Sequence, residues 1–170
     1  MRIQSFFCLV LPFALLLGSP GCGYRFSTGG NLPSGIGNIS VRMFENRTGE
    51  TGAEAILTNA LIAELMRSGV RIAQVDSADS RLEGVIESVN VGTVSRRSTQ
   101  VSTERRIEMA VLFKLFNRDG NLLSSGRVSE ERDYRVTANR TATDAARLNA
   151  IRQISQDVAE QVRHRLCENF

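Results

Sequence analysis

The stretch IEMAVLFKLFNRDG, residues 107–120, alternates in hydrophobicity and ends in a turn sequence. Every second residue at its start is apolar, which is the period of a β-strand with one buried face. These residues are Ile107, Met109, Val111, Phe113 and Leu115. Asp119-Gly120 is typical of a tight hairpin turn, so we expect the chain to return as an antiparallel strand through Val128, Tyr134 and Val136. The strand at 107–115 is the clearest strand of the predicted sheet.

Further strand signals lie before this hairpin. Leu82, Gly84 and Ile86 share one parity, whereas Val89 and Val91 have the other, which predicts a β-bulge near residues 87–88. Further upstream, the first strand is predicted from the alternation of three apolar residues: Ile39, Val41 and Met43. A short strand is expected over residues 70–75.

Two amphipathic helices complete the pattern. Thr51 and Glu54 have the spacing of a capping box, after which Leu57, Leu61 and Leu65 form an apolar stripe, and Gly69 ends the helix. A long second helix is predicted to open at Thr141 or Thr143. Its apolar side consists of Leu148, Ile151, Ile154, Val158, Val162 and Leu166.

The order of these elements predicts an α+β fold. The first strand, helix and next strand form a right-handed crossover unit. Two amphipathic helices would then pack on one face of a mostly antiparallel sheet, giving a two-layer sandwich. We expect residues 39–170 to form this single domain.

The N-terminal sequence indicates export and lipidation. Residues 1–21 combine one positive charge, Arg2, with an apolar run and then small residues, which is the pattern of a signal peptide. The signal ends at Cys22, so we predict cleavage there, attachment of lipid to the thiol, and a tether over residues 22–38. Gly23 follows the cysteine instead of aspartate, which favours the outer membrane. The alternatives are an uncleaved anchor and a buried or disulfide-bonded Cys22.

The composition argues against an enzyme and against nucleic acid as a partner. The net charge is only +3, and the chain has a single histidine, His164. We find no set of residues at metal-ligand spacing and no nucleophile–base arrangement, so we expect no catalytic residue, no metal and no cofactor. Cys167, on the last helix, is expected to be a small buried hydrophobic residue.

Two surface features carry functional hypotheses. Arg96, Arg97, Arg105 and Arg106 bracket a Ser/Thr/Gln-rich turn, where four guanidinium groups could hold phosphates or carboxylates. The alternative is a solvated hairpin tip. Apolar residues of the opposite parity to the core are the second feature, and they indicate either a partner-contact face or ordinary partial exposure. They are Ala110, Leu112 and Phe116.

Several segments together resemble the lipopolysaccharide-assembly lipoprotein family, LptE. The segments are CGYRF (22–26), VRMFENRT (41–48), LTNALIAELMRSG (57–69) and RLEG (81–84), followed by the long hairpin and the last helix. The resemblance implies a lipoprotein on the periplasmic face of the outer membrane. Such a protein plugs and helps assemble a β-barrel lipopolysaccharide translocon and binds lipopolysaccharide during its delivery to the surface. The first strand–helix–strand unit also resembles curli-secretion and penicillin-binding-protein-activator lipoproteins, which is the alternative.

Overall fold

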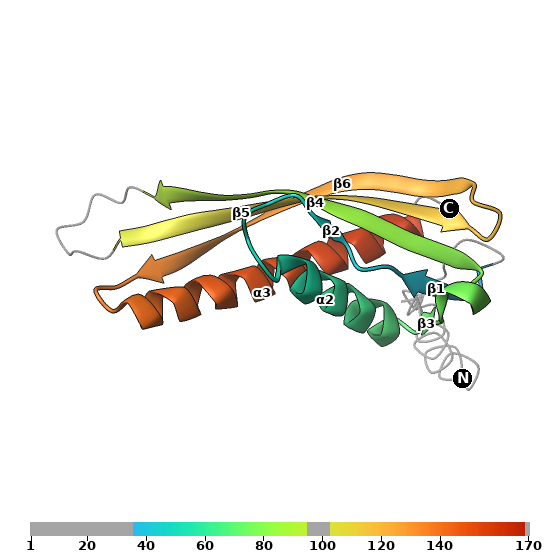
Figure 1. Cartoon of the computed structure of the whole chain (residues 1–170), viewed down its shortest axis with the longest axis horizontal. Helices are drawn as coiled ribbons and strands as arrows, with labels where there is room; N and C mark the ends of the chain where they lie inside the picture. Colours follow the sequence, from blue (N-terminus) through green and yellow to red (C-terminus); the bar gives the residue numbers. More distant parts are fainter. Residues whose placement is uncertain (1–35, 95–102, 169–170) are drawn as a thin grey trace, which may run out of the picture.

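The computed structural model describes residues 36–94 and 103–168, which form one layer of strands over one layer of helices (Figure 1). The predicted signal peptide and Cys22 lie outside these residues. The elements, in chain order, are β1 (Asn38–Val41), β2 (Glu45–Asn46), α2 (Ala53–Arg67), β3 (Arg71–Ile72), a 3₁₀ turn η1 (Val75–Ser77), β4 (Ser80–Val94), β5 (Thr103–Asn117), β6 (Leu122–Val136) and α3 (Arg140–Glu168).

The sheet is mixed, with its long strands antiparallel. Its order is β3-β1-β4-β5-β6, and β2 pairs separately with β4. The three long strands pair antiparallel, whereas β1 runs parallel to both β3 and β4. Both helices lie on one face, so the predicted α+β sandwich is confirmed. We call the opposite side of β4, β5 and β6 the helix-free face.

The core lies between β5 and the helices. All five alternating apolar residues of β5 are buried, as the sequence predicted. Phe113 is flanked across the sheet by Gly84 on β4 and by Gly126 on β6. The missing side chain of Gly126 leaves room for the Phe113 ring, since an added Cβ there would lie 2.9 Å from it. Phe44 packs over Gly84 in the same way.

The predicted irregularities of the sheet are also confirmed. The register of β4 against β5 shifts between Ile86 and Ser88, where the change of parity indicated a bulge. Gly120 has a φ of 86° in the β5–β6 turn, a conformation that glycine adopts without strain. Gly69 likewise has a φ of 87° just after α2.

The first strand differs from its prediction. It ends at Val41, and the chain then leaves the ladder before β2. Met43 was expected to face the core, but it is 64% exposed, and Phe44 is buried instead. The Phe44 N–H donates to Thr58 Oγ1 at 3.1 Å, which fixes the inward position of this residue. The strand predicted over residues 70–75 is also shorter: β3 covers only Arg71–Ile72, and η1 begins at Val75.

The helix starts were predicted incorrectly. Gly52 precedes α2 without a side-chain cap, so Thr51 and Glu54 do not form a capping box. Glu54 instead accepts a hydrogen bond from Asn46 Nδ2 at 2.7 Å. The second helix begins at Arg140, ahead of both predicted threonines.

Asn139 caps α3, since its Oδ1 accepts from the Ala142 N–H at 3.2 Å. Leu148 lies at the margin of the apolar side and is 39% exposed, whereas the other five predicted residues are buried. Cys167 is a half-buried free thiol.

Ion pairs fix α3 beside α2. Glu64 is buried between the helices and pairs with Arg163 at 2.7 Å and with Arg67 on its own helix. Arg147 pairs with Glu50, just before α2 begins. Beyond the N-terminal end of α2 only α3 continues under the sheet, so β4, β5 and β6 extend past the start of α2 (Figure 1).

Candidate functional site

The far end of the β4–β5 hairpin carries the predicted arginine cluster. The two strands pair as far as Val94 and Glu104, with Thr93 opposite Arg105. Arg105 and Arg106 therefore lie beside the connection between these strands, as the sequence suggested. Arg96 and Arg97 fall outside the described residues.

The two described arginines of the cluster point to opposite faces. They are consecutive on a strand, where side chains alternate. Arg105 has the parity of the core residues but is exposed beyond the packed core. Arg106 is on the helix-free face, where it pairs with Asp133 at 2.7 Å and Glu131 at 2.8 Å. The Asp133 carboxylate raises the pKa of Arg106 above its ordinary value by hydrogen bonding and charge.

The arginines of β6 differ in whether they form ion pairs. Arg127 pairs with Glu87 at 2.7 Å, and Arg132 pairs with Asp157 on α3. Arg135 is exposed opposite Glu104, close to the arginine cluster. Among the described residues neither Arg105 nor Arg135 takes part in an ion pair, so at this end of the sheet these two are the described cations most accessible to a ligand.

The predicted partner-contact residues all lie on the helix-free face, but they differ in exposure. Ala110 is only 1% exposed, because neighbouring strands cover its small side chain. Leu112 and Phe116 are half-buried. Lys114 stands between them, and the Arg81 guanidinium lies 5.5 Å from the centre of the Phe116 ring. The hypothesis of a contact face therefore depends on Leu112 and Phe116, which do not form one continuous apolar patch.

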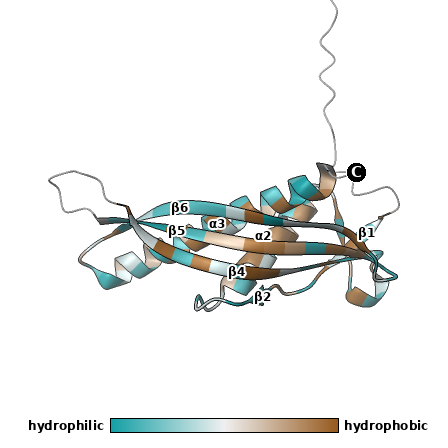
Figure 2. Ribbon diagram, turned by 90° about the horizontal axis from the view of Figure 1, so that it is seen from above, coloured by the Kyte–Doolittle hydropathy of each residue, from teal (hydrophilic) through white to brown (hydrophobic). Residues whose placement is uncertain are grey.

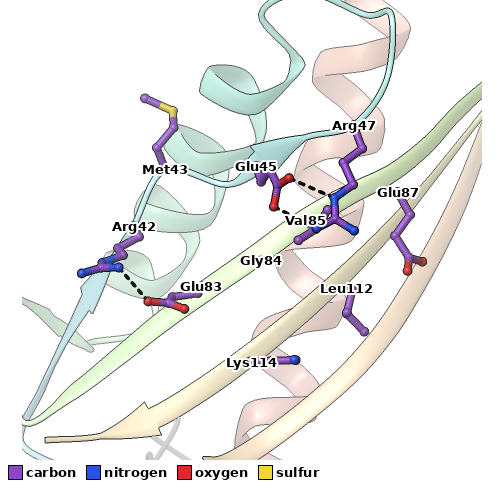
Figure 3. A pocket seen from close by; sticks show the side chains of 10 residues that line it. All are labelled: Arg42, Met43, Glu45, Arg47, Glu83, Gly84, Val85, Glu87, Leu112 and Lys114. Carbon is purple, nitrogen blue, oxygen red and sulfur yellow. Dashed lines mark hydrogen bonds and ion pairs between the residues drawn. The ribbon is translucent and has the colours of Figure 1, made fainter. Parts of the chain in front are cut away.

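A groove opens where the segment between β1 and β2 passes β4 and β5 (Figure 3). Its volume is about 430 Å³, and its apolar lining comes from Met43, Val85 and Leu112. Its rim is charged but largely self-paired: Arg42 contacts Glu83 at 3.1 Å, while Arg47 contacts Glu45 at 2.9 Å. The remaining residues that line it are Gly84, Glu87 and Lys114.

The groove was missed at the level of sequence because Met43 was assigned to the core. Lys114, the only lysine of the chain, lies at its edge and has no ion pair among the described residues. The groove can thus accept an apolar group beside one available cation. The signal that could have revealed it is the pair Met43-Phe44, where only one of two neighbouring large residues can face the core.

The described part of the chain contains no group of three or more His, Cys, Asp or Glu side chains that could hold a metal ion. His164 is exposed near the end of α3. Within the same residues, no helix has both the length and the hydrophobicity needed to cross a membrane.

Solved structures of several bacterial lipoproteins resemble this fold. A putative lipoprotein from Caulobacter crescentus aligns with a TM-score of 0.53 and 20% identity, over 74% of this chain and 88% of that one. A minor lipoprotein from Acinetobacter baumannii gives 0.54 and 17%, over 79% and 92%. An uncharacterized lipoprotein B from Nitrosomonas europaea gives 0.58 and 12%, over 83% and 87%. At these identities the likeness concerns the fold alone.

The family model of LptE, described as lipopolysaccharide-assembly, matches residues 36–166. The match covers the whole of the described sheet and nearly all of both helices. The chain therefore belongs to the LptE lipopolysaccharide-assembly family. No curated protein matched the sequence.

Proposed function

We propose that this chain is a lipoprotein of the outer membrane, anchored through Cys22 on the periplasmic face. It plugs and helps assemble a β-barrel lipopolysaccharide translocon, and it binds lipopolysaccharide as the glycolipid passes to the surface. Membership of the LptE family supports the assignment to lipopolysaccharide assembly. The proposed role requires no catalytic chemistry from the chain.

The observation that carries the proposed binding of lipopolysaccharide is the basic end of the long sheet. Lipopolysaccharide presents phosphates and sugar carboxylates, for which the planar guanidinium group is a suitable partner. Arg105 and Arg135 are exposed there without ion pairs among the described residues, and Arg106 lies beside them. We propose that Arg96 and Arg97 join them in the same site.

The proposed plug role is supported by the paired charges of the helix-free face. Its charges are largely paired across strands, as between Arg127 and Glu87 or between Arg106 and Asp133. A face of this kind can lie against a hydrated wall without leaving buried charges unpaired. We propose Leu112 and Phe116 as its contacts with the barrel.

Binding of lipopolysaccharide can be tested with the full-length chain in non-ionic detergent. Replacing Arg96, Arg97, Arg105 and Arg106 together by alanine should weaken binding at least about tenfold. A charge-assisted hydrogen bond contributes roughly 1.5–3 kcal/mol when well formed and less when exposed. About 1.4 kcal/mol is already a factor of ten. The melting temperature should change little, because exposed charges contribute little to stability.

A matched control removes the same charge elsewhere on the surface. It replaces Arg67, Arg71, Arg118 and Arg152, all of them exposed, by alanine. This control should bind lipopolysaccharide like the unmodified chain. Equal binding by the two variants would place the glycolipid away from the hairpin end, with the groove beside Lys114 as the next candidate.

The anchor and the partner require separate measurements. Mass spectrometry of the mature N-terminus should show an acylated Cys22, and Cys22→Ala should release the protein into the soluble periplasm. Affinity capture should recover a large outer-membrane barrel. Recovery of a peptidoglycan synthase would favour the activator-like alternative, although the family match includes the long hairpin that distinguishes the LptE family from it.

A further inference from the structure

Strand β6 forms a free edge of the sheet, because it pairs with β5 alone. Arg165 Nη1 donates to the Arg127 carbonyl at 2.8 Å, so this carbonyl points away from β5. In an antiparallel pair the outward-pointing groups recur at every second residue. Ser129 and Glu131 therefore also direct their N–H and C=O groups outward, and the described residues supply no partner for them. Such an edge is a template for another strand.

A groove runs beside this edge, between β6 and α3. Its volume is about 460 Å³. The side chains that line it are Glu130, Arg132, Asp157, Glu160, Gln161 and His164. Helix α3 packs beneath β6 along this stretch, and Figure 2 shows that β6 is largely hydrophilic here. A strand added to the edge would therefore direct every second side chain toward a polar groove instead of an apolar core.

The groove is acidic. It contains three carboxylates and a single guanidinium group, that of Arg132, which pairs with Asp157. Glu130 and Glu160 have no ion pair among the described residues. The groove thus leaves two carboxylates available to cations, and Glu130 is half-buried, where a paired charge is strengthened by reduced solvent screening.

We propose that β6 and this acidic groove bind an extended segment of a partner protein that carries Lys or Arg at alternate positions. Main-chain hydrogen bonds to Ser129 and Glu131 would align the segment, and its basic side chains would reach Glu130 and Glu160. A second copy of this chain is a poorer occupant, because the groove side of its own β6 carries one carboxylate, Glu130, and one guanidinium, Arg132, and so brings no net positive charge to the groove. This surface is formed by β6 and α3 and contains none of the four residues of the arginine cluster, so it can fail or succeed independently of lipopolysaccharide binding.

The test uses a labelled peptide of alternating lysine and threonine and, for comparison, a peptide with glutamate in place of each lysine. Binding to the full-length chain in non-ionic detergent is followed by fluorescence anisotropy. Ser129→Pro removes one outward N–H while leaving the β5 ladder intact, since proline is tolerated on the outer side of an edge strand. Ser129→Val is the matched control, because both variants lose the hydroxyl that donates to Glu108 at 3.0 Å.

The basic peptide should bind, and the acidic peptide should bind at least tenfold more weakly. Ser129→Pro should weaken binding of the basic peptide at least tenfold, and Ser129→Val should change it by less than twofold. Hydrogen exchange in residues 127–133 should slow when the basic peptide is bound. Equal binding of the two peptides, or unchanged exchange in this segment, would overturn the proposal.

A charge variant keeps the proposal testable if Ser129→Pro does not fold. Glu130→Gln with Glu160→Gln removes the two available carboxylates and should weaken binding of the basic peptide at least fivefold. Asp76→Asn with Asp119→Asn makes the same change in net charge at exposed positions outside the groove, so its affinity should stay within twofold. Equal losses in the two double variants would show a general charge effect and would refute the assigned groove. Sedimentation showing dimers that Ser129→Pro abolishes would also refute it, in favour of a second copy.

Discussion

Replacing Gly84 by alanine should destabilise the fold sharply, because the Phe44 ring occupies the space of the missing side chain. An added Cβ at Gly84 would lie 2.1 Å from Phe44 Cε1 and 2.6 Å from Cδ1. Carbon atoms in good contact are roughly 3.5–4.0 Å apart, so the ring would have to move by more than 1 Å. Phe44 is buried, and Thr58 holds its main-chain N–H, so little room exists for that movement.

The size of the loss follows from two limits. Forced overpacking of a core costs typically about 1–3 kcal/mol. If the ring is expelled altogether, the loss approaches that of deleting a buried phenylalanine, about 3–5 kcal/mol. We therefore expect Gly84→Ala to reduce the free energy of unfolding by at least about 2 kcal/mol. For a chain of this size that corresponds to a fall in melting temperature of roughly 4–8 °C.

The assay is urea unfolding of the full-length chain in non-ionic detergent, followed by circular dichroism, with Gly92→Ala as the control. Gly92 is on the same strand, and nothing lies within 4 Å of an added Cβ there. This control should be neutral or stabilise by about 0.4–1 kcal/mol, since alanine restricts the unfolded chain. In a Phe44→Ala background, Gly84→Ala should cost less than about 0.5 kcal/mol, which gives a coupling of at least about 1.5 kcal/mol. Equal effects of Gly84→Ala and Gly92→Ala would refute the packing argument.

Two further predictions concern the surface and the pH dependence. Photo-crosslinkers at Leu112 and Phe116 should trap an outer-membrane protein, whereas one at the covered Ala110 should trap little; capture of lipid alone at the first two would remove them as partner contacts. Hydrogen bonds, the largest from its own main chain, lower the pKa of Glu54 below its ordinary 4.5. The stability that Glu54 contributes is therefore present above about pH 4.5 and is lost as the pH falls through the lower folded-state pKa. Glu54→Gln should flatten the melting temperature against pH in that acidic range, and an unchanged slope would contradict this.

The features that the sequence predicted well are those decided by residue parity. In β5 every core residue is two positions from the next, so the alternation of apolar residues alone identifies the buried face of the strand. The bulge near residue 87 follows from the same rule, because Ile86 and Val89 can face one core only if the register shifts between them. These inferences need no knowledge of the neighbouring strands.

The incorrect predictions share a different cause. Met43 fits the alternation of Ile39 and Val41, but the ladder ends at Val41, and beyond that point parity no longer determines direction. Glu54 has capping-box spacing, yet Asn46 competes for its carboxylate from a segment eight residues away. In both cases a tertiary contact replaced a local preference, and sequence spacing alone does not reveal such contacts.

The alternation of side chains along β5 also limits how the arginine cluster can contact a ligand. Arg105 and Arg106 are adjacent in sequence but face opposite sides of β5, so one ligand group in direct contact with both must reach around the end of the hairpin. Arg106 is already held by Asp133 and Glu131, and a phosphate there would have to compete with two carboxylates. Arg105 has no such competitor among the described residues, and neither does Arg135 on β6. Cross-strand pairing with acidic residues, more than the number of arginines, therefore determines which cations at this end of the sheet remain available to an anionic glycolipid.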